Sequence, residues 1–341
     1  MKTIFIVDDN DTNLMAAKTA LDGTYKTFAF PSAEKMFKLL GKITPDLILL
    51  DVDMPEMDGF EAMSSLKSDE KFMSIPVVFL TAKHDAESEI HGFEMGALDF
   101  INKPFSAPVL IKRIETHIET DRLIKESQKA VRNIHNATIS VIADVVESRD
   151  SVTGGHIERT QLYLEILVKE LVRSGVYADE ISKWDINLLL PSAQLHDVGK
   201  IIVSDLILNK PGKLTDEEFN LIKQHCTEGE RIIDEIIGKT KDDGFLNHAK
   251  MFAGYHHEKW DGTGYPRGLH GEEIPLEGRI MAVADVYDAL VSERPYKKPF
   301  THEQAVEIIG KGSGTHFDPK IAEVFLNVAD DFRAKSASVT R

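Results

Sequence analysis

Polar side chains that could bind a cation close several short apolar runs near the N-terminus. Asp8 and Asp9 close the first run, Asp51 closes another, and Thr81 and Lys103 close two later ones. Three carboxylates held together repel one another unless a cation lies among them. Hard oxygen ligands suit Mg²⁺, and a carboxylate beside that ion can accept a phosphoryl group whose oxygens a lysine and a hydroxyl then bind. The pattern therefore predicts a phosphoryl-accepting site.

A second set combines histidines with carboxylates in the C-terminal part of the chain. Its members are His156, His196, Asp197, His225, His256, His257 and Asp285. A single histidine on a helix is more often an ordinary packing residue, but imidazole and carboxylate without thiolate suit Fe, Mn or Zn. Seven candidate ligands exceed the needs of one open catalytic metal, so the set predicts two metal ions.

The N-terminal residues that must position the first set alternate between two kinds of segment. The apolar runs of strand length are Thr3–Val7, Asp46–Leu50, Pro76–Leu80 and Leu98–Ile101, with Tyr25–Phe30 a weaker fifth. Amphipathic stretches of helical length, such as Asn13–Leu21 and Ala33–Leu40, separate them. This alternation predicts a doubly wound parallel α/β sheet, in which functional groups gather beyond the carboxyl ends of the strands.

Beyond the sheet the pattern becomes helical. After Pro108 there is no glycine or proline up to about Arg149, and apolar residues recur at helical, nearly heptad spacing. We expect one long helix over 107–149, or two nearly continuous ones, that joins the domains and is either packed on a core or forms a dimeric coiled coil. An all-α domain should follow, and the tail 334–341 should be disordered.

Three N-terminal motifs closely resemble the receiver domains of two-component response regulators. They are Asp51-Val-Asp-Met-Pro-Glu-Met-Asp-Gly59, Thr81-Ala82 and Lys103-Pro104-Phe105. The resemblance covers residues 1–120 and implies a five-stranded sheet of order 2-1-3-4-5 and a sensor histidine kinase as partner. It implies Asp51 as phosphoacceptor, Thr81 and Phe100 as switch residues, Lys103 as phosphate contact, and a cis bond before Pro104. The Mg²⁺ ligands that it implies are Asp8, Asp9, Asp51 and the backbone carbonyl of Asp53.

Two C-terminal motifs resemble the HD-GYP group of the HD phosphohydrolases. They are His196-Asp-Val-Gly-Lys200 and His257-Glu-Lys-Trp-Asp-Gly-Thr-Gly-Tyr-Pro266. The resemblance covers about 136–330 and implies hydrolysis of cyclic di-GMP to linear pGpG, GMP or both, with the seven residues above as ligands of two Fe or Mn ions. His196, Asp197 and Lys200 would be catalytic. Lys200, Arg294, Lys297 and Tyr265 would bind the substrate. A third metal in some members needs a glutamate where this chain has Val152, so two ions are expected.

Composition limits the other functions. The 341 residues suit two domains, and a net charge of −16 argues against a general nucleic-acid or anionic-membrane binder. The single cysteine, Cys226, excludes an intramolecular disulfide, and we expect it to be buried and to face away from His225. Without a signal peptide or a long apolar stretch, the protein should be cytoplasmic, without membrane insertion, and a homodimer is expected.

Two other functions stay open at this stage. The helical domain could be an adaptor that binds nucleotide or protein with little turnover, or a phosphodiesterase for another cyclic dinucleotide. Tight binding without turnover would favour the adaptor. Turnover of a panel of cyclic dinucleotides would distinguish a phosphodiesterase for another substrate from one for cyclic di-GMP.

Overall fold

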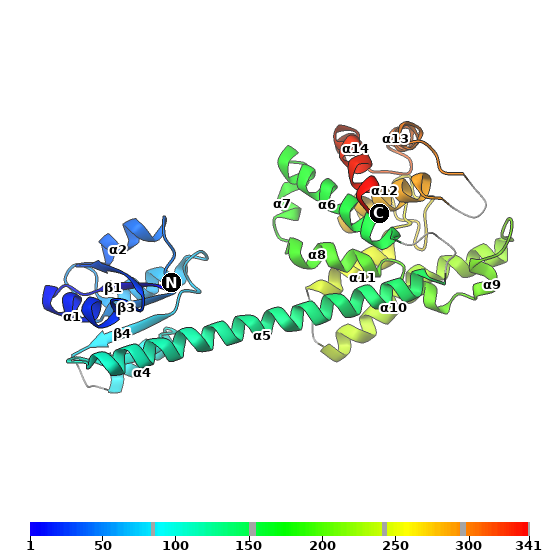
Figure 1. Ribbon diagram of the computed structural model, residues 1–341. Helices are drawn as coiled ribbons and strands as arrows, with labels where there is room; N and C mark the ends of the chain where they lie inside the picture. The colour runs from blue at the N-terminus through cyan, green and yellow to red at the C-terminus, as the bar shows by residue number, and fades with distance from the viewer. Residues whose placement is uncertain (83–85, 150–154, 241–243, 294–297, 340–341) are drawn as a thin grey trace. The chain divides into compact units, whose positions relative to one another are not determined.

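The computed structural model describes residues 1–82, 86–149, 155–240, 244–293 and 298–339. The chain divides into two compact units, Met1–Val131 and Arg132–Arg341 (Figure 1). Arg294 and Lys297, predicted to bind substrate, and Val152, on which the metal count depended, lie outside the described residues.

The first unit is built on a parallel sheet of five strands. The strands are β1 Thr3–Val7, β2 Lys26–Phe30, β3 Leu47–Asp51, β4 Val77–Thr81 and β5 Asp99–Asn102. Their order is β2-β1-β3-β4-β5, which confirms the predicted doubly wound topology. The central strands β3 and β4 are buried along their whole length, as parallel strands covered on both faces must be. Asp51 and Thr81 end these two strands, so their side chains lie at the same edge of the sheet.

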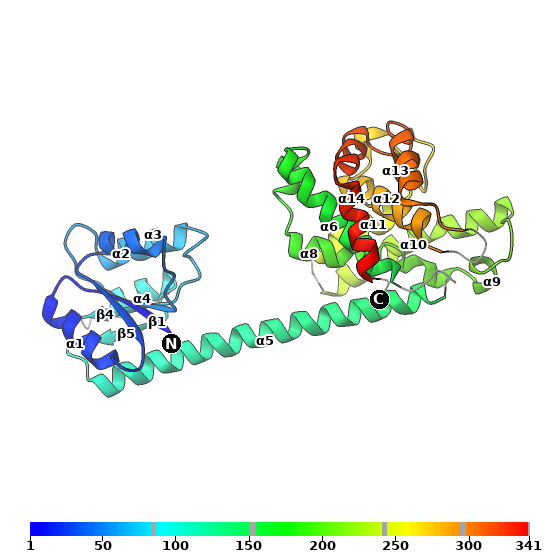
Figure 2. The same ribbon diagram turned by 45° about the horizontal axis from the view of Figure 1, so that its top comes forward.

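Helices cover both faces of this sheet (Figure 2). They are α1 Asp11–Leu21, α2 Ala33–Leu40, α3 Gly59–Ser68, α4 Ala86–Glu94 and the first turns of α5. Alternate residues of β1 divide between the faces: Phe5 and Val7 join the core under α2 and α3, whereas Ile4 and Ile6 join the core under α1 and α5. This period of two fixes which residues of each strand reach the polar edge.

Helix α5 is a single helix of 41 residues, Ala107–Glu147. Its first turns bury Leu110 and Ile114 in the core of the sheet domain. Arg113 and His117, one turn apart on α5, both bond to the carboxylate of Asp99 on β5. Further along, a row of exposed apolar side chains follows nearly heptad spacing, with Ile124 and Val131 seven residues apart.

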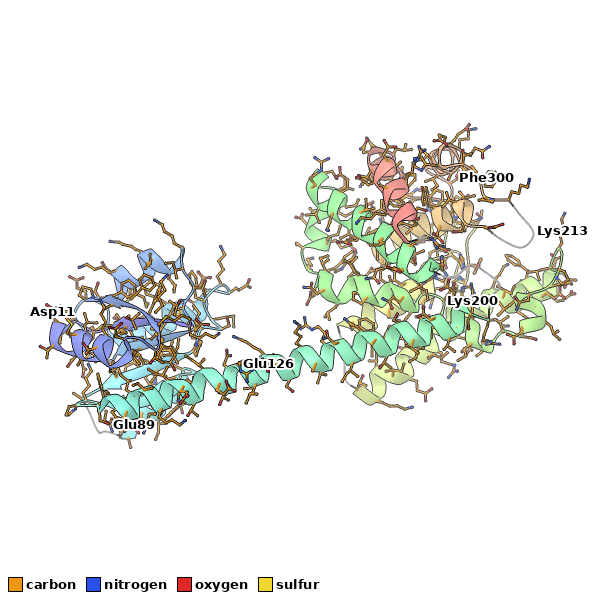
Figure 3. The ribbon with its side chains drawn as sticks, viewed as in Figure 1. Asp11, Glu89, Glu126, Lys200, Lys213 and Phe300 are labelled. Atoms are coloured by element: carbon orange, nitrogen blue, oxygen red, sulfur yellow. The ribbon has the colours of Figure 1, made fainter. Side chains whose placement is uncertain are left out.

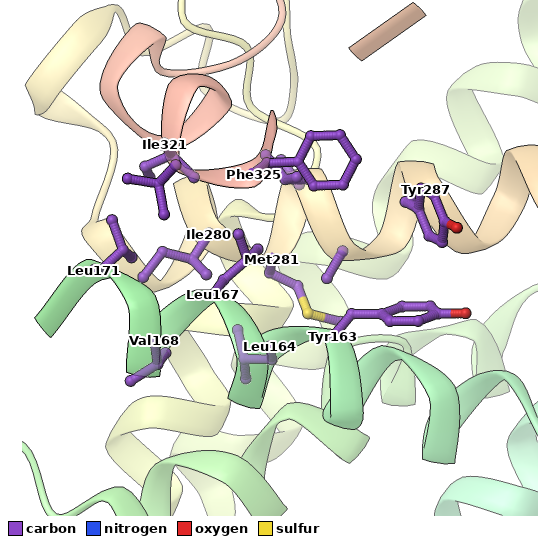
Figure 4. Close-up of a cluster of buried hydrophobic side chains, with 14 of the residues drawn as sticks. Tyr163, Leu164, Leu167, Val168, Leu171, Ile280, Met281, Tyr287, Ile321 and Phe325 are labelled. Atoms are coloured by element: carbon purple, nitrogen blue, oxygen red, sulfur yellow. The ribbon is translucent and has the colours of Figure 1, made fainter. Parts of the chain in front are cut away.

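The second unit is an all-α domain in its described residues, as predicted, with two isolated β-bridges between Asp261 and His270 and between Ser313 and Phe317. Its elements are α6 His156–Ser174, α7 Ala178–Ile181, α8 Ile186–Ser192, η1 Ala193–Leu195, η2 Val198–Ile202, α9 Asp205–Leu208, α10 Asp216–Thr240, α11 Phe245–Tyr255, η3 Gly271–Glu273, α12 Leu276–Val291, α13 His302–Lys311 and α14 Pro319–Val339. Figure 4 shows the main core, in which Leu164 and Leu167 of α6 face Met281 of α12 and Phe325 of α14.

Helix α14 differs from the prediction for the C-terminus. It is helical as far as Val339, whereas a disordered tail from Ala334 was expected. Phe332 is fully buried in the core, so the helix is anchored two residues before that point. Extending an anchored helix fixes few further dihedral angles for each hydrogen bond gained. None of the described helices combines the length and the apolar character needed to cross a lipid bilayer.

Candidate functional sites

The polar edge of the sheet brings together the predicted phosphoryl-accepting residues. Lys103 lies between two carboxylates, with its Nζ 2.6 Å from Oδ2 of Asp8 and 2.7 Å from Oδ1 of Asp51. Asp8 and Asp51 are buried, whereas Asp9 is exposed, and the three carboxylates can converge on one point. One ammonium cannot balance three carboxylates, so this donor set fits Mg²⁺, which prefers hard oxygen ligands.

The loop after β3 holds Asp51 at the carboxyl end of the sheet. Burial is the main reason that the pKa of Asp51 is raised, and Asp8 and Asp9 add to this against the opposing effect of Lys103. Gly59 packs so closely on this loop that a Cβ there would lie 2.3 Å from the carbonyl oxygen of Asp51. Asp53, whose carbonyl was predicted to bind Mg²⁺, is exposed in the same loop.

The two predicted switch residues are both buried. Thr81 ends β4, and the ring of Phe100 on β5 packs against Phe79 and Phe93, each with a centroid distance of 5.1 Å. Gly92 of α4 leaves room for this ring, because a Cβ there would lie 2.3 Å from a carbon of Phe100. The bond between Lys103 and Pro104 is cis, as the receiver resemblance implied.

The seven histidine and carboxylate residues predicted as metal ligands also come together. One group contains His156, His196 and Asp285, and a second contains His225, His256 and His257. They come from five separate segments: the start of α6, the turn between η1 and η2, the middle of α10, the end of α11 and the middle of α12. Tertiary packing therefore forms each group.

Four of the imidazoles are oriented by bonds at Nδ1. His196 donates to the carbonyl of Ala193 at 2.9 Å, His225 to Ile222 at 2.7 Å and His256 to Phe252 at 2.8 Å. The fourth, His156, donates to Asp288 at 2.8 Å. Each ring is then left with Nε2 as an electron-pair donor, the arrangement that outer partners impose on metal-binding histidines.

The Nε2 atoms of these rings face each other at short distances. They are 3.4 Å apart between His156 and His196, and 3.3 Å apart between His225 and His256. In neutral rings that carry their proton on Nδ1, both facing Nε2 atoms are electron-pair donors, and a cation between them would satisfy both. The donor set in this structure therefore fits divalent metal ions.

Asp197 lies between the two groups. One oxygen, Oδ1, is 3.3 Å from Nε2 of His225, and the other, Oδ2, is 3.5 Å from Nε2 of His196. The Oδ1 atom is buried without a hydrogen-bond partner among the described residues. A buried carboxylate oxygen left in this state is costly, so Asp197, which faces both histidine groups, would help to hold metal ions there.

The electrostatics keep most of this cluster in its ligand form. Burial lowers the pKa of His196, His225 and His257, and it lowers that of His256 to about 3. Burial opposes ionisation of Asp197, but Lys200 and the adjacent imidazoles outweigh it and hold the pKa of Asp197 well below the usual value. Neutral imidazoles beside an ionised carboxylate are what a transition-metal site requires.

His156 is the exception, because a carboxylate lies behind it. Burial opposes its protonation, yet the hydrogen bond to Asp288 and the nearby Asp285 raise the pKa of His156. Asp288 also accepts from Nε of Arg159 at 2.7 Å and from its Nη2 at 3.0 Å. Sequence reasoning did not assign a role to Asp288 or Arg159. The signal was available, since Asp288 lies one helical turn after Asp285 on α12.

Two of the predicted substrate residues are within the described part of the chain. Lys200, labelled in Figure 3, lies in η2 with its Nζ 2.7 Å from Oδ2 of Asp197. The ring of Tyr265 packs on that of His257 at a centroid distance of 4.7 Å, and its amide donates to the carbonyl of His257. The loop of Tyr265 depends on Gly264, where a Cβ would lie 2.3 Å from the backbone nitrogen of Lys259.

Cys226 is fully buried, as predicted, but the expectation that it faces away from His225 is wrong. Its Sγ lies 3.4 Å from Nε2 of His225. The two side chains are adjacent on α10, and the imidazole lies along the helix because its Nδ1 bonds to Ile222 one turn earlier. That orientation brings Nε2 of His225 close to the side chain of Cys226.

A cavity of about 290 Å³ opens at the histidine cluster. Its wall includes Asp197, Lys200 and members of both histidine groups, together with Gln194 and Glu147. The last turns of α5 contribute Glu147, whose Oε1 is buried without a hydrogen-bond partner among the described residues. Burial raises the pKa of Glu147. The histidine and carboxylate cluster therefore lies at the wall of a ligand-sized cavity.

Comparison with known families matches both halves of the chain. Residues 4–115 match the response regulator receiver domain, and residues 140–321 match the HD domain. The chain belongs to the HD domain family and carries a receiver domain ahead of that domain. HD domains are metal-dependent hydrolases, and the receiver domain implies a kinase that donates phosphoryl groups.

Relatives with known names extend the comparison. The chain is 39% identical to a "Probable cyclic di-GMP phosphodiesterase" of Vibrio cholerae, over 97% of this chain and 78% of the relative. It is 34% identical to the "Cyclic di-GMP phosphodiesterase response regulator RpfG" of Xanthomonas campestris pv. campestris, over 82% of this chain and 75% of the relative. It is also 40% identical to the "3'3'-cGAMP-specific phosphodiesterase 2" of Vibrio cholerae, over 58% of this chain but 35% of the relative.

Proposed function

We propose that the protein is a response regulator whose HD domain hydrolyses cyclic di-GMP to pGpG, GMP or both. The observation that carries this proposal is the pair of histidine groups with Asp197 between them, at the wall of a cavity. The relatives of Vibrio and Xanthomonas, which match most of the chain and are named for cyclic di-GMP, support the choice of substrate.

The seven clustered residues would hold two ions, for which Fe²⁺ or Mn²⁺ suits the nitrogen and oxygen donors. When bound, such ions activate water and neutralise the charge that develops on a phosphodiester. The chain's own residues orient this site. Asp288 and three backbone carbonyls hold the imidazole rings, and Asp197 faces both groups. Lys200 would hold a substrate phosphate, with Arg294 and Lys297 as further candidates, and Tyr265 would border the substrate beside His257.

The receiver site would control this activity. We assign Asp51 as phosphoacceptor, with Mg²⁺ held by Asp8, Asp9, Asp51 and the carbonyl of Asp53. Lys103 already contacts two of these carboxylates and would bind the phosphoryl oxygens. A phosphoryl group adds charge and acceptor oxygens, which can draw Thr81 and shift the packing of Phe100. A sensor histidine kinase would be the donor.

The domain limits and the oligomeric state belong to the same proposal. We assign 1–120 to the receiver, 107–149 to the connecting helix and 136–330 to the phosphodiesterase domain. A second copy of the chain would cover the apolar row of α5. Its exposed members are Ile124, Val131, Ile134, Val141 and Val145, which are spaced by seven, three, seven and four residues, as in a heptad pattern. Light scattering on the wild type and on Val131→Glu tests this dimer.

Turnover of cyclic di-GMP by protein loaded with Mn²⁺ tests the enzymatic part. His196→Ala and Asp197→Asn should each abolish product formation, because each removes a ligand that faces the cavity. His270→Gln is the matched control, since His270 is an exposed histidine outside both groups. Including 3'3'-cGAMP in the panel tests the alternative substrate, and tight binding without product would indicate an adaptor instead.

A further inference from the structure

The last residue described before residue 155 is Arg149, which follows the C-terminal turn of α5. Its amide still bonds to the carbonyl of Val146, so Arg149 continues the backbone of that turn. Its side chain is directed at a segment about fifty residues further along the chain, between η2 and α9.

The guanidinium of Arg149 bonds to the carboxyl end of η2. Its Nη1 donates to the carbonyl of Ile201 at 2.6 Å and more weakly to that of Lys200 at 3.4 Å. Its Nη2 donates to the carbonyl of Val203 at 2.9 Å, and its Nε donates to Asp205 at 3.0 Å. Carbonyls at a helix end have no partners within the helix, and the planar guanidinium can bond several of them at once.

A second bond joins the same two segments in the opposite direction. The side-chain amide of Asn209 donates to the backbone carbonyl of Arg149 at 2.7 Å. The end of α5 is therefore held by both its side chain and its backbone. The bonds to Asp205, whose side chain is 64% exposed, and to Ile201 reach exposed residues, whereas the bonds with Val203 and Asn209 are partly buried.

The opposite side of η2 is fixed by close packing on α10. A Cβ at Gly199 would lie 1.9 Å from the carbonyl oxygen of His225 and 2.5 Å from the amide nitrogen of Gly229. Segment η2 is thus held between α10 and Arg149. It carries Lys200 and directly follows Asp197, the two residues joined at 2.7 Å beside the histidine groups.

We infer that Arg149 is a positioning residue for the phosphodiesterase reaction. By bonding the carbonyls of η2 to the end of α5, it fixes the segment that presents Lys200 and Asp197 to the cavity. Without it, the carbonyls of Lys200, Ile201 and Val203 lose a charged donor, and η2 loses its bonds to the end of α5. The expected fall in kcat rests on the proposed function, because it requires cyclic di-GMP to be the substrate. The expected loosening of η2 does not depend on the substrate.

The test compares Arg149→Ala, Arg149→Lys and Asp205→Asn in the full-length protein loaded with Mn²⁺. In Arg149→Ala we expect kcat for cyclic di-GMP to fall about tenfold to hundredfold, the usual effect of losing an outer residue that orients a site. KM should change much less. Arg149→Lys should recover part of kcat, since a lysine can bond one carbonyl but not the whole set. Asp205→Asn keeps the carbonyl bonds and should stay within about threefold of wild type, as surface substitutions do.

Hydrogen exchange provides a readout that does not need turnover. Amides of Lys200 and Val203, which bond within η2, should exchange about tenfold faster in Arg149→Ala, while α12 and α14 stay protected. Unchanged kcat and unchanged exchange in Arg149→Ala would overturn the inference. An equal loss of kcat and of amide protection in Asp205→Asn would also overturn the inference, because the effect would then come from the exposed ion pair between Arg149 and Asp205. If the wild type fails to hydrolyse cyclic di-GMP, the proposed function fails, and the exchange data still decide the role of Arg149.

Discussion

Replacing Asp288 with asparagine removes the charge behind His156 and keeps the shape of the side chain. The carboxylate is almost wholly buried, with 1% of its side chain exposed, and Arg159, which it pairs with, is 8% exposed. Because so little solvent reaches the pair, removing the charge of Asp288 leaves the buried Arg159 beside a neutral amide in place of its carboxylate partner. We therefore expect the free energy of unfolding of the C-terminal unit to fall by about 3–5 kcal/mol.

The measurable effect is a lower melting temperature and weaker metal binding. For a domain of this size, the loss corresponds to a Tm lower by about 6–20 °C. His156 also loses the charged acceptor at its Nδ1, which should weaken metal binding by about tenfold to hundredfold. Calorimetry of the metal-free protein and titration with Mn²⁺ measure the two effects separately.

A surface ion pair is the control for this prediction. Glu303→Gln removes the partner of Arg333 in a pair whose side chains are 68% and 63% exposed. Solvent screens such a pair, so Tm should stay near that of the wild type. If Asp288→Asn has the same Tm and the same Mn²⁺ affinity as Glu303→Gln, the reasoning about the buried bonds between Asp288, His156 and Arg159 is wrong.

Three further predictions concern the receiver domain and the loop of Tyr265. Gly92→Ala should displace the ring of Phe100 from its buried position and destabilise the receiver, seen as a lower first transition in calorimetry and a changed Phe100 ring resonance. Burial opposes ionisation of Asp99, but the bonds from His117 and Arg113 outweigh it, so the pKa of Asp99 is lowered. Ionised Asp99 therefore stabilises the receiver at pH values above about 3.9, the pKa of Asp in the unfolded chain. This contribution to stability is lost as the pH falls through the lower pKa that Asp99 has in the folded receiver. Asp99→Asn should accordingly lose less receiver stability than the wild type between pH 6 and pH 3, and an identical pH profile would contradict this. Gly264→Ala should force the loop away from the backbone of Lys259, and a turnover assay should show slower hydrolysis with the metal content retained.

The receiver half shows what local pattern can predict. Five apolar runs gave the strands within one or two residues, because a parallel strand covered on both faces must be apolar along its length. The residues at the strand ends then had to share an edge, which is where Asp51 and Lys103 meet. The burial of Phe100 could not be predicted, because its ring occupies space that is free only because residue 92 of α4 is a glycine.

The helical half shows where prediction from sequence ended. The motifs identified the seven cluster residues, but the bonds that orient them join positions far apart in the chain. Asp288 lies 132 residues from His156, and Arg149 lies 52 residues from Ile201. Such contacts follow from tertiary packing, which spacing along one helix does not reveal. The predicted orientation of Cys226 was wrong for the same reason, since the contact between its Sγ and His225 depends on how the ring of His225 is anchored.

The proposed function is hydrolysis of cyclic di-GMP by the HD domain, whose clustered residues would hold two metal ions, under control of Asp51. It is tested most directly by measuring metal content and turnover together on anaerobically purified protein, with and without beryllofluoride. We expect two transition-metal ions per chain, a linear product from cyclic di-GMP, loss of that product in Asp197→Asn, and a change of rate when beryllofluoride occupies the receiver. Full metal loading with no linear product would contradict it.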